Sequence, residues 1–335
     1  MNPSVSQKER IIALDIIRGL ALFGILFINV GAYQLIVEGV ALPPYSKFNS
    51  IIDTLIDIFI EKKFFSIFSF LFGVGFYIFA SRAEARGDKP RLRFARRLLA
   101  LFVIGVVHIF IFWGSILSIY AVIGLFLLPF YRAKISTIRN WLGQMFLPNL
   151  RILSSIFNIF GNDILTIFIM FLTGFLVAKA DWISNVRQHA KQIKAVLYVT
   201  FPIVIAISSW IWIASQNEDP KLHLLLGLGV VPTTYFYLAC LFLILENRKI
   251  VTFLKPIGRV GQMAFTNYIA QSFIGLAIIA LLGLEVPSTS YIVIIAMMIF
   301  IIQILFSVIW FKFFKIGPLE KMWRWMTYGK NISTK

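Results

Sequence analysis

Three polar residues, Asp15, Arg18 and Asn29, interrupt the first long apolar run of the chain. At 100° per residue they fall within an arc of about 60°, so they form one polar stripe on a helix. A guanidinium can hold a phosphate through two parallel hydrogen bonds, which makes Arg18 a candidate contact for a phosphate-bearing donor. The alternative is an Asp15–Arg18 pair that only positions the helix at the membrane edge.

His108 is the histidine best placed for acid–base chemistry. It lies in an apolar run six residues before Gly114, and Tyr120 follows that turn by a similar distance, so the two side chains are expected at similar depth. A buried neutral histidine can act as a general base, a general acid or a nucleophile. A lone histidine on an apolar helix is, however, more often a hydrogen-bonded structural residue. The three histidines show no metal-ligand spacing, and no metal is assigned.

A second group of polar residues lies within two helical turns near the C-terminal end: Thr266, Asn267, Tyr268 and Gln271. Asn267 and Gln271 are four residues apart and therefore share one helix face. This density indicates the wall of a polar, substrate-binding cavity. Interhelical hydrogen bonds that hold a membrane bundle together would give the same pattern.

The composition requires that these residues are carried by membrane helices. Of the 335 residues, 59% are hydrophobic and 14% are charged, and the mean hydropathy is +0.85. Soluble domains carry roughly a quarter charged residues, so a disordered chain, a disulfide scaffold and a cytosolic enzyme are excluded. The sequence predicts an all-α integral membrane protein, with about ten transmembrane helices in one polytopic domain over residues 1–335. The expected spans are 12–37, 64–81, 98–114, 115–131, 141–160, 164–179, 195–215, 222–245, 260–283 and 290–316.

Positive charge is distributed unevenly between the two sides of the expected bundle. There are 32 Lys and Arg residues against 15 Asp and Glu, and 26 of the 32 fall on one side. The loop 82–97 alone carries seven of them. The positive-inside rule therefore predicts that this loop and both termini are cytoplasmic in a protein of the cell membrane. Because topology explains the charge, nucleic acid is not assigned as a partner.

Between the first two expected spans, residues 51–63 predict an amphipathic helix at the outer interface. Asp53, Asp57 and Glu61 recur every four residues on one face, with Ile and Leu opposite. The acidic face is either solvated or part of a lid over an outward-facing cavity.

Five blocks stand in order along the chain: IIALDIIRGLALFGILFINV (11–30), EKKFFSIFSFLFGVGF (61–76), the RRLL…VVHIF…WGSILSIYAVIG hairpin (96–124), GRVGQMAFTNYIAQS (258–272) and GPLEKMWRWMTYGK (317–330). Together they resemble the YeiB-type membrane proteins, domain of unknown function 418. The LDxxRG opening also makes the chain similar, more distantly, to transmembrane acyltransferases. Those take an acyl group from cytoplasmic acyl-CoA and deliver it to an acceptor at or across the membrane.

The resemblance implies which positions belong to the shared motifs. They are Asp15, Arg18, Gly19, Asn29, Glu61, Lys62, His108, Tyr120, Thr266, Asn267, Tyr268, Gln271, Gly317, Pro318, Trp323 and Tyr328. One departure is important: the family hairpin usually reads GDIL, whereas this chain has Ser115 at the position of the aspartate. A serine cannot supply the carboxylate that would orient a histidine. Either Glu61 or Asp163 substitutes for it in space, or the chemistry of this chain is weaker or different.

The leading hypothesis is an acyltransferase that uses acyl-CoA as donor and a small-molecule, lipid or sugar acceptor. Arg18, with Asp15 and Asn29, would hold the donor, and His108, with Glu61, would provide the catalytic groups. Tyr120 and the 266–271 cluster would contact the substrate and the developing oxyanion. The alternative is a transporter or a lipid- or quinone-binding membrane protein without covalent chemistry. Membrane lipids are expected partners in either case, and a homodimer is an open alternative.

Overall fold

The computed structural model describes residues 7–33, 46–145 and 163–329, and these residues are helical or lie in the short connections between helices. Within these ranges, six stretches are long and apolar enough to cross a membrane: 12–32, 47–85, 190–216, 222–244, 264–281 and 289–313. The prediction of an all-α membrane protein is confirmed. Ten spans and cytoplasmic termini stay predictions.

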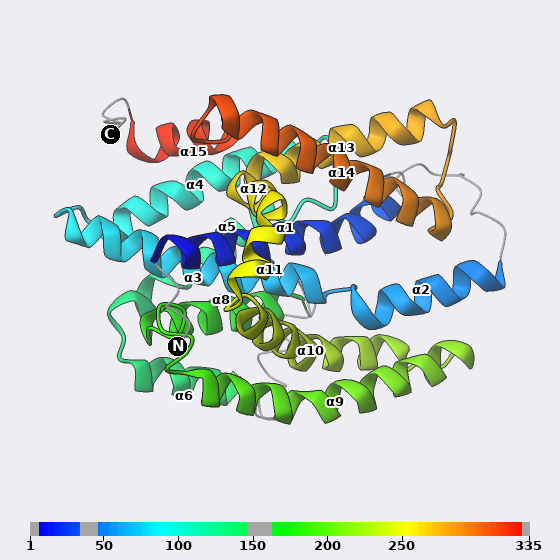
Figure 1. Cartoon of the computed structure of the whole chain (residues 1–335), viewed down its shortest axis with the longest axis horizontal. Helices are drawn as coiled ribbons and strands as arrows, with labels where there is room; N and C mark the ends of the chain where they lie inside the picture. Colours follow the sequence, from blue (N-terminus) through cyan, green and yellow to red (C-terminus); the bar gives the residue numbers. More distant parts are fainter. Residues whose placement is uncertain (1–6, 34–45, 146–162, 330–335) are drawn as a thin grey trace. The chain divides into compact units, whose positions relative to one another are not determined.

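The described residues form two compact units. The first unit comprises residues 1–65, 111–114 and 190–317. Within it, α1 packs against α12, α13 and α14, and α9 packs against α10 and α2. Its helices, labelled in Figure 1, are α1 (Gln7–Ala32), α2 (Lys47–Phe59), α9 (Ala190–Gln216), α10 (Leu222–Ile244), α11 (Arg248–Phe253), α12 (Lys255–Gln262), α13 (Ala264–Leu281) and α14 (Thr289–Phe313).

Glycine allows α1 and α12 to touch through their backbones. A Cβ atom on Gly261 would lie 1.8 Å from the carbonyl oxygen of Asp15, and one on Gly19 would lie 2.3 Å from that of Ile257. Any larger residue would push the two helices apart. This contact brings the polar stripe of α1 next to the end of α12.

The second unit comprises residues 66–110, 115–189 and 318–335. It is centred on a close crossing of α3 and α8, where a Cβ atom on Gly73 or Gly174 would lie 1.9 Å from a carbonyl oxygen of the facing helix. Phe72 stacks on Phe171 beside this crossing. The helices of this unit are α3 (Lys63–Ala85, mostly in this unit), α4 (Pro90–Ile109), α5 (Leu117–Leu125), the 3₁₀ helix η1 (Leu128–Arg132), α6 (Ile135–Met145), α8 (Asp163–Lys179) and α15 (Pro318–Tyr328).

Most helices follow the expected spans, with two differences. The span expected over 260–283 is interrupted at Met263, where α12 ends and α13 begins. The 115–131 segment contains α5, whose nine residues measure about 14 Å, and then η1. Most of the expected 141–160 span lies outside the described residues.

The helix expected over 51–63 is shifted toward the N-terminus. α2 runs from Lys47 to Phe59, and Glu61 lies in the turn before α3, where Lys62 has a φ of 62°. The face of Asp53 also contacts protein, since Thr289 donates a hydrogen bond of 2.7 Å to its carboxylate.

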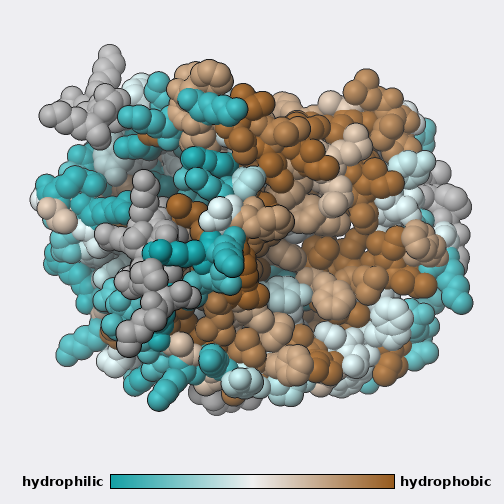
Figure 2. Space-filling view, in the orientation of Figure 1, coloured by the Kyte–Doolittle hydropathy of each residue, from teal (hydrophilic) through white to brown (hydrophobic). Residues whose placement is uncertain are grey.

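Exposed hydrophobic side chains cover the outside of several helices. On α14 they include Ile294, Ile301, Leu305 and Ile309, each more than half exposed. Figure 2 shows hydrophobic residues gathered over α13 and α14. Such surfaces are stable in lipid and not in water, which agrees with a membrane protein.

Candidate functional site

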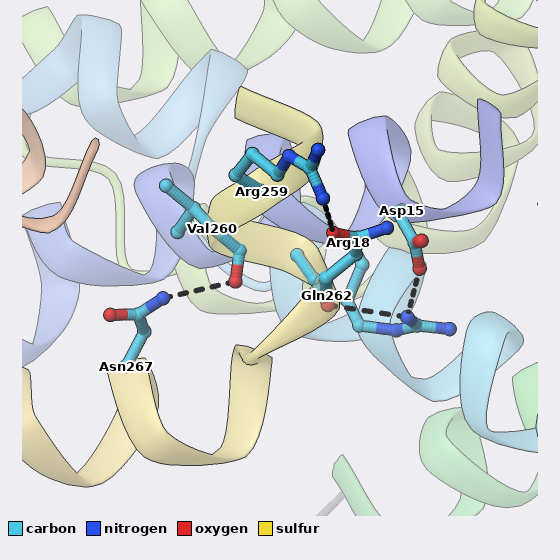
Figure 3. A network of polar contacts seen from close by, with 7 residues as sticks. Asp15, Arg18, Arg259, Val260, Gln262 and Asn267 are labelled. Atoms are coloured by element: carbon cyan, nitrogen blue, oxygen red, sulfur yellow. Dashed lines mark hydrogen bonds and ion pairs between the residues drawn. The ribbon is translucent and has the colours of Figure 1, made fainter. Parts of the chain in front are cut away.

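The polar stripe of α1 forms an ion pair that also reaches α12. Nη1 of Arg18 lies 2.7 Å from Oδ1 of Asp15 and donates a second, longer bond of 3.3 Å to the carbonyl oxygen of Gly261 (Figure 3). The Asp15 side chain is 10% exposed and that of Arg18 is 28% exposed. Arg18 is therefore held by the protein on one side and accessible on the other.

A second guanidinium lies close to the same carboxylate. Arg259 donates a hydrogen bond of 2.8 Å to Oε1 of Gln262, and both side chains lie near the Asp15 carboxylate. Arg259 also lies over the ring of Phe311, 5.2 Å from its centre. Two cations thus face one anion, a net positive charge where α1 meets α12.

Neither Arg259 nor Gln262 is predicted as a site residue from the sequence. Both occur in the GRVGQ segment that carries the family resemblance. That segment is the one signal that could have identified them, because their closeness to Asp15 depends on the tertiary contact between α1 and α12.

Asn267 on α13 makes hydrogen bonds to α12 and α14. Its Nδ2 donates to the carbonyl oxygen of Val260 and to Oγ of Ser307, both at 3.0 Å. Its own backbone carbonyl accepts a bond of 2.7 Å from Nε2 of Gln303. The predicted 266–271 cluster is buried, and Asn267 makes the interhelical hydrogen bonds that the sequence left as the alternative to a cavity wall. Thr266, Tyr268 and Gln271 are also buried.

His108 lies near the C-terminal end of α4 and is paired with Ser115. Nδ1 of His108 is 2.8 Å from Oγ of Ser115, and the two residues are only 1% and 3% exposed. A Cβ atom on Gly105 would lie 2.5 Å from the backbone nitrogen of Ser118, so glycine permits α4 and α5 to approach closely. The residue that departs from the usual hairpin sequence thus contacts the imidazole directly, as a hydroxyl in place of a carboxylate.

Tyr120 is buried on α5, with its hydroxyl oxygen 2.6 Å from Oγ of Ser69 on α3. Its ring packs edge-on against Phe72 and Phe171. This contact joins Tyr120 to the α3–α8 crossing of the second unit.

Glu61 and Asn29 belong to the first unit. The backbone N–H of Glu61 donates a bond of 2.8 Å to the carbonyl oxygen of Ile56, and its carboxylate lies beside Asp57 and Lys63. The pairing of Glu61 with His108 stays a prediction. Asn29 is 7% exposed.

Across the described ranges, no three His, Cys, Asp or Glu side chains are grouped so that they could hold a metal ion.

Comparison with known proteins gives one family and several full-length relatives. The family described as "Protein of unknown function (DUF418)" matches residues 177–330. An uncharacterized 39.9 kDa protein encoded in an amylase 3' region of Bacillus acidopullulyticus is 31% identical, covering 99% of this chain and 97% of its own length. YxaH of Bacillus subtilis is 28% identical, with 98% and 96% covered, and YeiB of Escherichia coli is 23% identical, with 95% and 96% covered. No solved structure matches this chain.

Proposed function

We propose that this chain, which belongs to the YeiB-type DUF418 family of membrane proteins, is an acyltransferase that moves an acyl group from acyl-CoA to an acceptor hydroxyl or amine. The observation that carries the proposal is the buried pair of His108 and Ser115, with 2.8 Å between Nδ1 and Oγ. A histidine whose one ring nitrogen is fixed by a hydrogen bond is oriented to transfer a proton at the other.

In the proposed step, His108 is the general base. If Nδ1 carries the imidazole proton and its N–H donates a hydrogen bond to Oγ of Ser115, then Nε2 accepts the proton of the acceptor hydroxyl. The acceptor oxygen forms a bond to the thioester carbonyl carbon as the carbon–sulfur bond breaks. The proton on Nε2 then passes to the leaving thiolate of CoA, so the histidine returns to its neutral form.

The donor phosphates require positive charge, and this chain offers it in two places. The first is the α1–α12 contact, where Arg18 and Arg259 outnumber Asp15. Because Arg18 is partly exposed, it can exchange its weak bond to Gly261 for a phosphate oxygen. The second is the 82–97 segment with its seven cations.

The oxyanion and the acceptor also need hydrogen-bond donors. Both Nδ2 protons of Asn267 are already donated in hydrogen bonds, one to Val260 and one to Ser307. Tyr268, Thr266 and Tyr120 each carry a hydroxyl, which can donate and accept, and they are the proposed substrate contacts.

The test is transfer of labelled acetyl or longer acyl groups from acyl-CoA by the purified protein in lipid vesicles, with an extract of polar lipids and sugars as acceptor. His108→Gln keeps the size and hydrogen-bonding capacity but cannot exchange a proton near neutral pH. It is expected to fold, to bind acyl-CoA and to lose about 10²- to 10⁴-fold in rate.

Full activity of His108→Gln would remove histidine catalysis from the mechanism. Failure of the parent protein to bind any acyl-CoA would refute acyl transfer and favour the transporter or the lipid- or quinone-binding alternative.

A further inference from the structure

α11 is a short helix on the surface of the first unit, and it follows directly after a candidate membrane span. α10 has 23 residues, which measure about 34 Å and match the roughly 30 Å hydrocarbon core of a bilayer. Only the segment 245–247 separates the end of α10 from the start of α11. So short a link keeps α11 near the level of the lipid headgroups.

The direction of α11 also fits the membrane surface. It packs against α1 and α12, and in Figure 1 it runs across the direction of α1, a candidate span. The side chain of Asn247 caps its first turn by accepting a hydrogen bond of 2.9 Å from the backbone N–H of Lys249. Val251 faces the protein and is 9% exposed. α11 therefore lies across the spans, with one face against the protein and the other outward.

The outer face of α11 contains an open depression with a volume of about 460 Å³. The described residues that line it are Arg248, Lys249, Thr252 and Phe253. Residues four apart lie on the same helix face, so Arg248 is beside Thr252 and Lys249 is beside Phe253. All of them are exposed, and Phe253 is 81% exposed. The depression therefore brings two cations, a hydroxyl and an aromatic ring together at one place.

These side chains match the parts of an anionic phospholipid. A guanidinium binds a phosphate through two parallel hydrogen bonds, and the adjacent ammonium adds a second positive charge. The Thr252 hydroxyl donates to the carbonyl oxygen of Arg248 at 2.9 Å, which leaves its oxygen as an acceptor for a glycerol hydroxyl. A phenyl ring as exposed as Phe253 is unfavourable in water and stable among acyl chains.

The charge around α11 favours an anionic partner over a zwitterionic one. The segment 245–259 contains a single acidic residue, Glu246, and four cations: Arg248, Lys249, Lys255 and Arg259. Lys255 is exposed at the start of α12, two residues beyond Phe253. The net positive charge thus continues from the depression onto the neighbouring helix.

We propose that the depression on α11 binds the headgroup of an anionic phospholipid, with phosphatidylglycerol as the simplest example. Arg248 and Lys249 hold the phosphate, and Phe253 inserts among the acyl chains. The inference goes beyond acyl transfer, because it uses neither His108 nor Arg18. Its tests measure lipid binding alone, so their failure is separate from failure of the proposed catalysis.

The first test titrates the purified protein in an uncharged detergent with dioctanoyl phosphatidylglycerol and follows the melting temperature. Arg248→Gln/Lys249→Gln is expected to bind this lipid about 10- to 30-fold more weakly, because each cation near an anionic headgroup contributes about fivefold in affinity. The matched control is Lys191→Gln/Lys194→Gln, which removes two exposed cations from α9 on the same predicted side of the membrane. It is expected to change the affinity by less than about twofold. Unchanged affinity in the α11 variant, or an equal loss in the control, would overturn the proposal.

The second test separates a phospholipid from other sources of phosphate. Dioctanoyl phosphatidylcholine has the same chains with a zwitterionic headgroup, and glycerol phosphate has the anion without chains. Neither is expected to raise the melting temperature of the parent protein. Phe253→Ser, which keeps both cations, is expected to weaken the binding of dioctanoyl phosphatidylglycerol. A shift with phosphatidylcholine or glycerol phosphate equal to that with phosphatidylglycerol, or full lipid binding by Phe253→Ser, would refute the assignment.

Discussion

Ser115 replaces a carboxylate with a hydroxyl 2.8 Å from Nδ1 of His108. A hydroxyl can fix the tautomer of the imidazole but adds no negative charge to stabilise the imidazolium that forms during transfer. A charge-assisted hydrogen bond contributes about 1 kcal/mol more than a neutral one. We therefore expect Ser115→Asp to increase the initial rate of acyl transfer about fivefold at fixed acyl-CoA.

Ser115→Ala serves as the comparison and is expected to reduce the rate while leaving the affinity for acyl-CoA unchanged. A folded but inactive Ser115→Asp variant would contradict the expected rate increase. It would mean that the Ser115 hydroxyl itself forms the bond to the acyl group and that His108 is the base for Ser115.

Arg18 gives a second prediction at the level of a single residue. In Arg18→Ala, Asp15 keeps Gln262 and the charge of Arg259 nearby, so folding is expected to survive. A lost phosphate contact is worth about 1.5–3 kcal/mol, which corresponds to about 10- to 150-fold weaker binding of acyl-CoA. The measurement is a titration of purified protein with labelled acyl-CoA.

Lys221→Ala, which removes an exposed cation on the predicted outer side, is the control and is expected to bind normally. Collapse of expression with unchanged affinity in the surviving Arg18→Ala protein would instead assign Arg18 to the structural pair.

At the level of single residues, the sequence identified side chains suited to chemistry more reliably than it identified the residues that contact them. Asp15, Arg18 and His108 are identifiable because a charge or an imidazole in an apolar run is costly. Gly261 and Gln262 are not, since tertiary packing of α12 on α1 brings them near. Ser115 is identified only through the resemblance, as the position of the usual hairpin aspartate, and its contact with His108 comes from the structure.

Among the helices, the α3–α8 crossing makes the sharpest prediction. A Cβ atom on Gly73 would lie 1.9 Å from the carbonyl oxygen of Phe171, whereas one on Gly75, on the same helix, meets nothing within 4 Å. Gly73→Ala is expected to destabilise the protein by about 1–3 kcal/mol. Gly75→Ala is expected to be neutral or to stabilise by up to about 1 kcal/mol. Thermal unfolding of both variants in the same detergent checks this, and equal melting temperatures would contradict the crossing.

Hydropathy predicted the existence of the helices more reliably than their interruptions. The apolar run over 260–283 reads as one span, but the structure breaks it at Met263. The carbonyl oxygen of Val260 accepts there from Nδ2 of Asn267 as well as from the backbone N–H of Met263. A side chain that donates to a carbonyl oxygen at the break lowers the free-energy cost of the break in lipid. A hydropathy average does not register such a hydrogen bond.

At the scale of the whole molecule, the positive-inside prediction is testable with cysteines placed by the structure. Gly87 in the basic loop has a φ of 75°, so the exposed Ala85 beside it is the better site. With Cys240 replaced by serine, Ala85→Cys is expected to react with an impermeant thiol reagent only after the inner leaflet is breached. Asn217→Cys, exposed between two spans on the predicted outer side, is expected to react in intact cells. The reverse pattern would invert the topology.

The bond between Arg18 and Gly261 joins residues 243 positions apart. At 5–20 residues per second, the ribosome needs about 12–50 s to make the second residue after the first. During that interval α1 is in or near the bilayer without α12, and an isolated arginine there would be expelled. Arg18 and Asp15 are, however, three residues apart on α1 and can neutralise each other as soon as that helix forms. The Asp15–Arg18 pair therefore allows α1 of the nascent chain to remain in the membrane until α12, which is translated much later, packs against it.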